Sequence, residues 1–334
     1  MTPGLRFSLR DFVRLNPAPG SHRVALRAGL SVAVPLLTVV LIDRTSWALY
    51  AAFGAFASIY GRNHVHLSRA VMQATVSLSL VTAVVLGSVF AAVHASPWAL
   101  VLGGAAVAAV GSIVSTVLDW HPPGPVFVLF AFGAVASSPG GWSDVPVALV
   151  VTAASAAFAV AVGNIGSVAR WTAATRPQLR SPWSREPLRF LVAVGLSGAI
   201  ATAAGIGHPY WAMVAAAAPL TARGLDHQAL RAGHRIAGTV LGLATCAPLL
   251  VLELGPVALV LVVVALQVAT EFFVGRNYGL ALLFITPMAI LMGQLGTSRP
   301  VGPLLGDRVV ETVIGALVEV ALLLVEHRRA RRNT

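Results

Sequence analysis

Long apolar runs separated by short polar segments fill the chain from residue 24 to residue 326. A membrane-spanning helix needs about 20 predominantly apolar residues, and these runs are continuous where a barrel strand would alternate. The pattern predicts an all-α polytopic membrane protein with about 12 transmembrane helices. The runs cover residues 24–42, 46–60, 70–93, 97–118, 125–138, 145–168, 188–206, 209–222, 232–252, 256–273, 278–293 and 307–326.

The composition supports this class. Of 334 residues, 57% are hydrophobic and only 10% are charged, whereas a soluble domain has roughly 25% charged residues. The mean hydropathy is +0.82. Such a chain has too little polar surface for a large soluble catalytic domain, and its single cysteine, Cys246, excludes a disulfide-stabilised secreted scaffold.

The distribution of arginine predicts the orientation. The net charge is +11, and all 23 basic residues are arginine. With the N-terminus in the cytoplasm, twenty arginines fall on the cytoplasmic side and only Arg44, Arg299 and Arg308 fall on the outer side. This bias is typical of a cell (inner or plasma) membrane protein with both termini cytoplasmic. It explains the basic charge without a nucleic-acid partner.

Short sequence features recur with a nearly constant spacing. Gly29-Leu30-Ser31 returns after 166 residues, Trp47-Ala48 after 164, and the Pro-x-Ala-Leu-Val-Leu run after 159. The recurrence predicts two tandem six-helix units, which form a pseudo-dimer about an axis along the membrane normal. The predicted domains are a cytoplasmic amphipathic segment, a first unit, a basic linker, a second unit and a basic tail, at residues 1–22, 23–169, 170–186, 187–327 and 328–334.

The second and fifth runs of each unit are short for a membrane span. Each has about 14 to 16 residues, whereas a full span needs about 20. Short or interrupted helices at matching positions of two repeats indicate the central pathway of a transporter. The alternative is that they are buried or re-entrant helices packed by their neighbours.

The last apolar run carries four acids on one helical face. Asp307 and Glu326 are expected to be interfacial, whereas Glu311 and Glu319 fall inside the hydrocarbon region. An acid there costs at least about 2.5–3.5 kcal/mol unless it faces water or a partner. Glu311 and Glu319 are therefore proton-coupling candidates along a polar pathway, and a structural ion pair with an arginine is the alternative.

Two further helices add polar stripes. Gln267 and Glu271 are one turn apart, and Arg231, Arg235 and Thr239 follow at a spacing of four residues. We predict that Gln267 and Glu271 serve proton coupling and that the two arginines attract an anion. The alternative is that these arginines belong to the ordinary positive charge at the cytoplasmic side of the membrane.

The first unit has few counterparts of these residues. Arg69, a weaker anion-attracting candidate, and Gln73 hold the place of the two arginines. The acids are replaced: Glu311 and Glu319 correspond to Ala148 and Ala156, and Gln267 and Glu271 to Ala108 and Ser112. The second unit is therefore expected to carry the titratable chemistry.

No motif predicts an enzyme, a metal site or a cofactor. His64-x-His66 has no third ligand nearby, and the chain has no phosphate-binding glycine loop and no Gly-x-Ser-x-Gly elbow. Any energy source is therefore expected to be an ion gradient.

One stretch of the second unit resembles a known family. Glu271-x4-Arg276-Asn277-Tyr278-Gly279-Leu280-Ala281-Leu282-Leu283-Phe284-Ile285-Thr286-Pro287, preceded by Arg235-x2-Gly238-Thr239-x2-Gly242, resembles the fusaric acid resistance protein family, also called the aromatic acid exporter family. The opening Asn16-Pro17-Ala18-Pro19 is similar too.

The resemblance implies an inner-membrane exporter of aromatic or other organic acids, driven by the proton gradient and built of repeated six-helix units. The family is distantly similar to plant malate-permeable channels, in which two six-helix subunits surround an anion pathway. The functional residues it implies are Arg235, Thr239, Glu271, Arg276 and Asn277. Longer members have a large cytoplasmic domain, where this chain has a short linker.

The motif supplies the remaining site candidates. Arg276 joins the anion-attracting residues, and Thr239, Asn277, Thr286 and Pro287 are candidates for the lining of the pathway.

The sequence therefore predicts a proton-coupled exporter of small organic acids, with an organic anion and the lipid bilayer as partners. A passive organic-anion channel is the main alternative. A lipid-modifying membrane enzyme and an assembly partner of another complex are weaker alternatives. A homo-oligomer stays open, because alanine- and glycine-rich helices permit close packing on any face.

Overall fold

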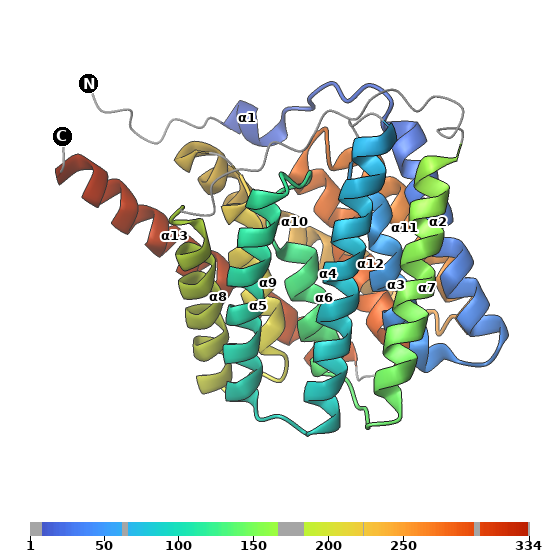
Figure 1. The fold of residues 1–334 in the computed structure, drawn as a ribbon. Coiled ribbons are helices and arrows are strands. Elements are labelled where there is room, and N and C mark those ends of the chain that lie inside the picture. The colour runs from blue at the N-terminus through green and yellow to red at the C-terminus, as the bar shows by residue number, and fades with distance from the viewer. Residues whose placement is uncertain (1–8, 62–65, 166–183, 223, 297–300, 333–334) are drawn as a thin grey trace.

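A computed structural model describes residues 9–61, 66–165, 184–222, 224–296 and 301–332. His64 and most of the predicted linker, with Arg170, Arg176 and Arg180, lie outside the described residues. Within the described ranges the regular structure is entirely helical (Figure 1). The predicted all-α class is confirmed.

The first half of the chain forms six helical stretches after a short helix, α1 (Leu9–Val13). In the second stretch, two 3₁₀ turns flank a short α-helix. The elements are α2 (Ser21–Leu41), η1 (Thr45–Trp47), α3 (Ala48–Ala55), η2 (Phe56–Ile59), α4 (His66–Ala92), α5 (Pro97–Val117), α6 (Val126–Ala136) and α7 (Asp144–Asn164).

The second half forms six more helices. Each apolar run of the sequence overlaps one helical stretch of the structure. The helices are α8 (Glu186–Ala203), α9 (Pro209–Leu220), α10 (Leu225–Val251), α11 (Pro256–Phe273), α12 (Tyr278–Gly296) and α13 (Val301–Arg332).

Two boundaries differ from the sequence-based expectation. Helix α12 has 19 residues, so the prediction that this fifth run is short is wrong; the helix continues through Gly293 and Gln294. Helix α13 has 32 residues. It begins before Asp307 and runs through the arginines of the predicted tail.

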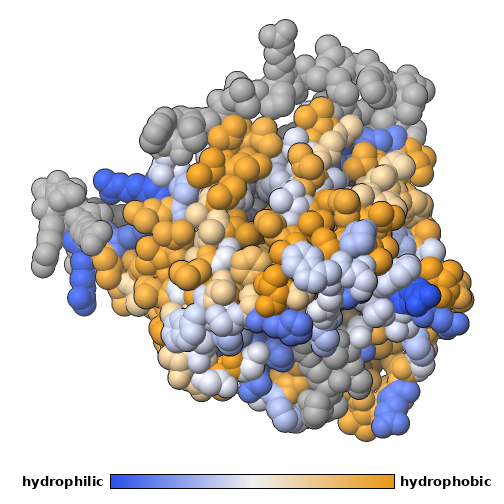
Figure 2. Space-filling model, turned by 60° about the horizontal axis from the view of Figure 1, so that its bottom comes forward, coloured by the Kyte–Doolittle hydropathy of each residue, from blue (hydrophilic) through white to orange (hydrophobic). Residues whose placement is uncertain are grey.

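Eight of the described helices are long and apolar enough to cross a membrane, namely α2, α4, α5, α7, α8, α10, α11 and α12. Their outward faces carry large hydrophobic side chains such as Leu78, Leu102 and Leu261. Figure 2 shows hydrophobic side chains over much of the flank of the bundle. Such a surface is typical of a multi-pass membrane protein, because lipid and not water covers it.

The same pairs of helices pack together in the two halves. The first helix of each half packs on the fourth helix of the other, as α2 on α11 and α8 on α5. Within each half the third helix packs on the fifth, as α4 on α6 and α10 on α12. The second and sixth also pair, as α3 with α7 and α9 with α13.

A glycine permits the contact between the second and sixth helices in both halves. A Cβ atom on Gly54 of α3 would lie 2.3 Å from the carbonyl oxygen of Thr152 in α7. One on Gly315 of α13 would lie 2.5 Å from the carbonyl oxygen of Ala212 in α9. Small residues let membrane helices approach this closely.

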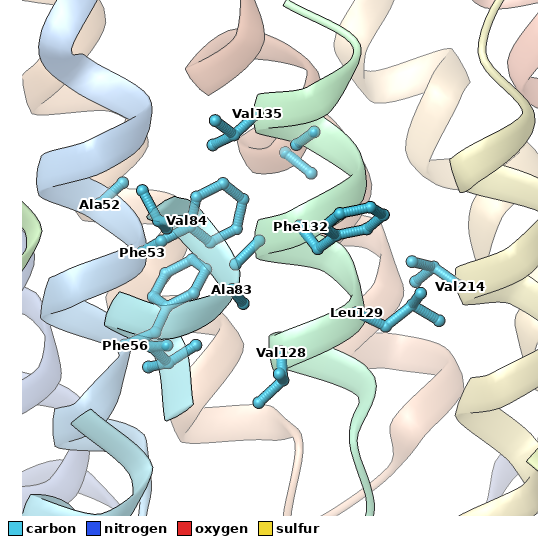
Figure 3. Close-up of a cluster of buried hydrophobic side chains, with 14 of the residues drawn as sticks. Ala52, Phe53, Phe56, Ala83, Val84, Val128, Leu129, Phe132, Val135 and Val214 are labelled. Atoms are coloured by element: carbon cyan, nitrogen blue, oxygen red, sulfur yellow. The ribbon is translucent and has the colours of Figure 1, made fainter. Parts of the chain in front are cut away.

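Aromatic and aliphatic side chains fill the first half around α6. Phe53 and Phe56 face α6 from one side, and Leu129 and Phe132 extend from α6 (Figure 3). Val214 of α9 approaches Leu129 from the other half (Figure 3). This core holds the short helices α3 and α6 in the middle of the bundle.

Helix α1 lies across one end of the bundle, at the top of Figure 1. We call this the α1 end and the other the opposite end. Helices α4, α6, α10 and α12 start at the α1 end, whereas α13 starts at the opposite end (Figure 1).

Candidate functional site

A cavity of about 530 Å³ lies between the two halves. Its wall combines aromatic and aliphatic side chains with a few charged ones. The first half contributes η2, the α5–α6 loop and α6, through Phe56, Ile59, His121, Pro122, Pro123, Gly124, Val126, Phe127 and Phe130. The second half contributes α9 to α13, through Trp211, Val214, Ala218, Thr221, Arg231, Arg235, Gln267, Thr270, Glu271, Val274, Tyr278, Ile285, Met288, Ala289, Met292 and Arg308.

Helix α10 presents two arginines to the cavity. Arg231 donates to the hydroxyl of Thr221 at 2.7 Å, and its guanidinium lies 4.6 Å from the ring centroid of Tyr278. Arg235, one turn deeper, donates to the Tyr278 hydroxyl at 3.2 Å. Both predicted anion-attracting residues of this helix therefore line the cavity, where Thr221 and Tyr278 position them.

Arg308 of α13 is a third cation on the wall. As the last apolar run predicts, it is inside a helix, and it is only 3% exposed. Its guanidinium stacks over the Trp211 ring at 3.8 Å, which is a strong cation–π geometry. Since α13 starts at the opposite end, Arg308 lies deeper than Arg231 and Arg235.

Helix α11 presents the one carboxylate among the described lining residues. Glu271 is 3% exposed, and the amide of Gln267 donates to its Oε1 at 3.4 Å. The predicted pair therefore lies on one face and reaches the cavity. The cations of this wall outnumber its acids three to one.

The loop between α5 and α6 closes part of the wall nearest the α1 end. Its shape depends on Gly124, which has a φ of 88° and whose Cβ would lie 2.6 Å from the Thr221 methyl. The Gly124 N–H donates to Ser115 Oγ at 2.7 Å, and the His121 carbonyl accepts from the Gly61 N–H at 2.9 Å. These bonds fix the loop against the cavity.

Three aromatic rings close the inner end. Phe130 lies 4.8 Å from Trp211 and 6.3 Å from Tyr210, and Tyr210 stacks on Trp211 at 5.0 Å, all between ring centroids. Beyond them a void of only about 30 Å³ leads toward the opposite end. Phe130, Trp211, Ala289 and Met292 line both spaces, so this aromatic barrier (Phe130, Tyr210 and Trp211) lies, together with α12, between the cavity and the void.

Three predicted lining residues lie in helix contacts and not on the wall. Thr239 and Thr286 are at most 1% exposed, and Pro287 is buried. A Cβ on Gly242 would lie 2.7 Å from the Cβ of Thr286, so this threonine faces the α10–α12 contact. These residues support α10 and α12, whose neighbouring turns carry the lining.

Arg276 and Asn277 hold the N-terminal segment. Asn277 Nδ2 donates to the carbonyl oxygens of Phe12 and Arg14 at 3.0 and 3.1 Å, and its Oδ1 caps α12 by accepting from the Leu280 N–H at 2.9 Å. Arg276 donates to Ser21 Oγ at 2.7 Å. Neither residue lines the cavity. Both stabilise the packing of the N-terminal segment at the α1 end.

Arg69 also serves backbone structure. It donates to the carbonyl oxygens of Gly61 and Gly163, both at 3.1 Å. Gln73, one turn further, donates to the Tyr60 carbonyl at 3.1 Å. Arg69 does not line the cavity, although the sequence repeat predicts that it corresponds to Arg231.

The acids of α13 are buried inside the bundle. Glu311 is 1% exposed and Glu319 is 0% exposed, yet neither lines the cavity. Both carboxylate oxygens of Glu319 lack a hydrogen-bond partner within the described part of the chain. At the α1 end, Glu326 pairs with Arg189 of α8 at 2.7 Å. A proton-coupling role for Glu311 and Glu319 stays a prediction.

Sequence reasoning missed three residues of the site. Arg308 follows Asp307 and a glycine- and proline-rich stretch, which reads as a loop. Tyr278 and Trp211 resemble ordinary interfacial aromatics. One feature of the sequence pointed to Trp211: it lies in one of the short apolar runs that were predicted to form the central pathway.

Comparison with known proteins supports the family resemblance. Residues 196–322 match the fusaric acid resistance protein-like family. The matched segment includes all three cavity arginines and Glu271.

A curated relative agrees with the membrane class. It is the "Uncharacterized membrane protein YvaC" of Bacillus subtilis (strain 168), which is 30% identical over 143 residues. The match covers 41% of this chain and 23% of the relative, so the chain spans about a quarter of that protein's length. No solved structure matches the chain. The chain is a multi-pass membrane protein with a fusaric acid resistance protein-like region.

Proposed function

We propose that the chain is a transporter that exports small organic anions, aromatic acids among them. The observation that carries this proposal is the central cavity, whose wall has three guanidinium groups and one carboxylate among the described residues. Charged side chains inside a membrane protein are costly and mark substrate pathways. This cavity therefore suits an anionic cargo.

The contacts of the arginines leave their positive charge available. Arg231 and Arg235 bind the hydroxyls of Thr221 and Tyr278, and Arg308 stacks on Trp211. All three of these partners are neutral. Even with Glu311, the acid one turn from Arg308, cations outnumber acids three to two around the cavity. A bound anion would balance the excess.

The rest of the wall suits an organic body. Phe56, Phe127, Phe130, Trp211 and Tyr278 all line the cavity. Aromatic rings pack on flat hydrophobic groups with offset or edge geometry. A volume of about 530 Å³ lies in the range of small-molecule sites.

The aromatic barrier favours a gated mechanism over an open pore. Phe130, Tyr210 and Trp211 stack across the inner end, and only the small void lies beyond them. Cargo must therefore wait for a rearrangement before it crosses. A passive organic-anion channel remains the alternative and would conduct without any ion gradient.

Proton coupling belongs to the same proposal. Glu271 on the wall and the buried acids Glu311 and Glu319 are the titratable groups that would exchange protons. Glu271 could respond directly to the cargo because both occupy the cavity. If Glu319 carries the proton instead, Glu319→Gln removes the effect of a pH gradient and Glu271→Gln does not.

In the proposed arrangement, the protein lies in the cell membrane as two tandem six-helix units, and both of its termini lie in the cytoplasm. The matching helix pairs of the two halves support the repeat, and the arginine distribution supports the orientation. The α1 end of the cavity then faces the cytoplasm, where an exporter loads its cargo.

Flux through proteoliposomes tests this function. Benzenesulfonate is a suitable probe, because it stays ionised and does not cross lipid as a neutral acid. Vesicles loaded with it are diluted with and without an inward proton gradient, and efflux is followed for the wild type, Arg235→Gln and Arg44→Gln. Arg44 is an exposed arginine near Trp47, outside the cavity.

We expect efflux from wild-type vesicles, faster with the proton gradient, a loss of at least about tenfold in Arg235→Gln, and no change in Arg44→Gln. Gradient-independent conductance would favour the channel. Efflux no faster than from empty liposomes would reject the transporter.

A further inference from the structure

We propose that Arg308 and Arg235 form an inner carboxylate-binding site, which receives the cargo directly above the aromatic barrier. This inference rests on the proposed function and deepens it. It places the bound anion at a defined depth and links its binding to the closed end of the cavity.

Arg308 is the stronger half of the site. The side chain is 3% exposed, lines the cavity and comes from the helix that starts at the opposite end. Within the described part of the chain, its buried Nε and Nη1 atoms have no hydrogen-bond partner. A buried donor without a partner costs free energy, and a ligand oxygen would remove that cost.

Arg235 supplies the second cation. It is 4% exposed, and its Nη1 is held by the Tyr278 hydroxyl at 3.2 Å. Its buried Nε lacks a hydrogen-bond partner among the described residues. Arg235 is also close enough to Arg308 for the two charges to repel. Two like charges in a desolvated space favour an anion between them.

The chemistry of the free donors favours a carboxylate. A guanidinium presents neighbouring N–H groups in a planar fork that matches two carboxylate oxygens. Phe127 and Phe130 line the same cavity, where the rest of an organic acid can pack. Glu311, next to Arg308 on α13, offsets one of the two cations, so a monovalent anion completes the balance.

Trp211 connects this site to the barrier. Its ring lies 3.8 Å below the Arg308 guanidinium and 4.8 Å from Phe130, centroid to centroid. A carboxylate that binds the N–H groups of Arg308 offsets its positive charge, so the cation–π attraction to the ring weakens. Binding then loosens Trp211, a member of the barrier that the cargo must pass. The fluorescence of this tryptophan should report occupancy.

Calorimetric titration of the purified full-length chain with benzoate at neutral pH tests the site. The variants are Arg308→Gln, Arg308→Lys and the control Arg44→Gln, which removes another arginine beside a tryptophan but away from the cavity. We expect Arg308→Gln to weaken binding at least tenfold, Arg308→Lys to restore part of it, and Arg44→Gln to match the wild type. Wild-type affinity in a folded Arg308→Gln protein would overturn the inner site.

A second readout covers the case in which Arg308→Gln does not fold. Benzoate should change the tryptophan emission of the wild type, and this change should be lost in Trp211→Phe. An equal change in both proteins would overturn the link to Trp211. If the wild type transports benzenesulfonate while Arg308→Gln binds benzoate normally, only the inner site fails. If the wild type neither binds benzoate nor transports benzenesulfonate, the proposed function fails as well.

Discussion

Helices α4 and α10 stand third in their respective halves, yet they use their polar residues in opposite ways. On α4, Arg69 donates to the carbonyl oxygens of Gly61 and Gly163, so its charge serves the backbone. On α10, Arg231, which the sequence repeat predicts to correspond to Arg69, lines the cavity, where it contacts a hydroxyl and an aromatic ring. An arginine thus hydrogen-bonds backbone carbonyl groups in one half and lines the cavity in the other.

The fourth helices differ in the same direction. Helix α11 brings Gln267 and Glu271 to the cavity, whereas the corresponding residues of α5 are Ala108 and Ser112. Both halves nevertheless pack their helices in matching pairs. A common helix arrangement is therefore compatible with a specialised half: the second half supplies the charged residues of the cavity, and the first supplies aromatic surface and the α5–α6 loop.

The largest effect should come from Glu271→Gln. The change removes the one carboxylate among the described lining residues, so the cavity can no longer exchange a proton there. We expect anion efflux to lose its whole dependence on a pH gradient, while benzoate binding at neutral pH tightens a few-fold because the net positive charge rises. Glu326→Gln, which breaks an ion pair outside the cavity, is the control. Coupling that survives in Glu271→Gln would move the proton site to Glu311 or Glu319.

The next effect distinguishes the two third helices. Arg231→Gln should weaken benzoate binding about tenfold, or about 1.4 kcal/mol, with little change in thermal stability. Arg69→Gln should leave benzoate binding nearly unchanged but lower the thermal stability. It leaves two backbone carbonyl groups without their donor, which costs roughly 1–3 kcal/mol of stability. Calorimetric titration and thermal unfolding in one detergent measure both. If both variants changed the same quantity, the functional division between the halves would be lost.

A further change should affect the stability of the two halves equally. Gly54→Ala and Gly315→Ala each place a methyl within 2.5 Å of a backbone carbonyl oxygen on the neighbouring helix. Overpacking of this kind typically costs about 1–3 kcal/mol. We expect a similar fall in the midpoint of thermal unfolding for both. Gly141→Ala, at a position with open space around it, should be neutral. A tolerated substitution in one half alone would show that the frames differ.

The smallest effect should come from Tyr278→Phe. Its hydroxyl accepts from Arg235 at 3.2 Å, and its ring stays beside Arg231 after the change. Loss of one hydrogen bond is worth about 0.5–1.5 kcal/mol, so benzoate binding should weaken about threefold. Tyr278→Ala, which also removes the ring, should weaken it further. Equal affinities for the two variants would mean that the hydroxyl alone positions the arginines.

The helices could be predicted from the sequence because backbone groups inside a lipid bilayer must find their hydrogen-bond partners within the protein. Each apolar run had to become a helix that satisfies its own backbone, and the runs and helices coincide. The ends of the helices were harder to predict. Helix α13 starts within a stretch rich in glycine and proline that includes Gly302 and Pro303, and this composition normally indicates a loop.

The site was predictable only where its residues shared one helix. Arg231, Arg235 and Gln267 with Glu271 follow helical spacing, and the structure brings all four to one cavity. Arg308 needed Trp211, almost one hundred residues away, to explain its burial. Likewise, Asn277 contacts Phe12 at the other end of the chain. Contacts over such distances leave no periodicity in a single sequence.

A comparison of benzoate with benzamide tests the central claim most directly, because the two ligands share a ring and differ in charge. Binding of each to the wild-type chain is measured by calorimetry at neutral pH. Since the three arginines of the cavity recognise the negative charge, benzoate should bind at least about tenfold more tightly than benzamide. Equal affinities, or binding of benzamide alone, would contradict an anion site in the cavity.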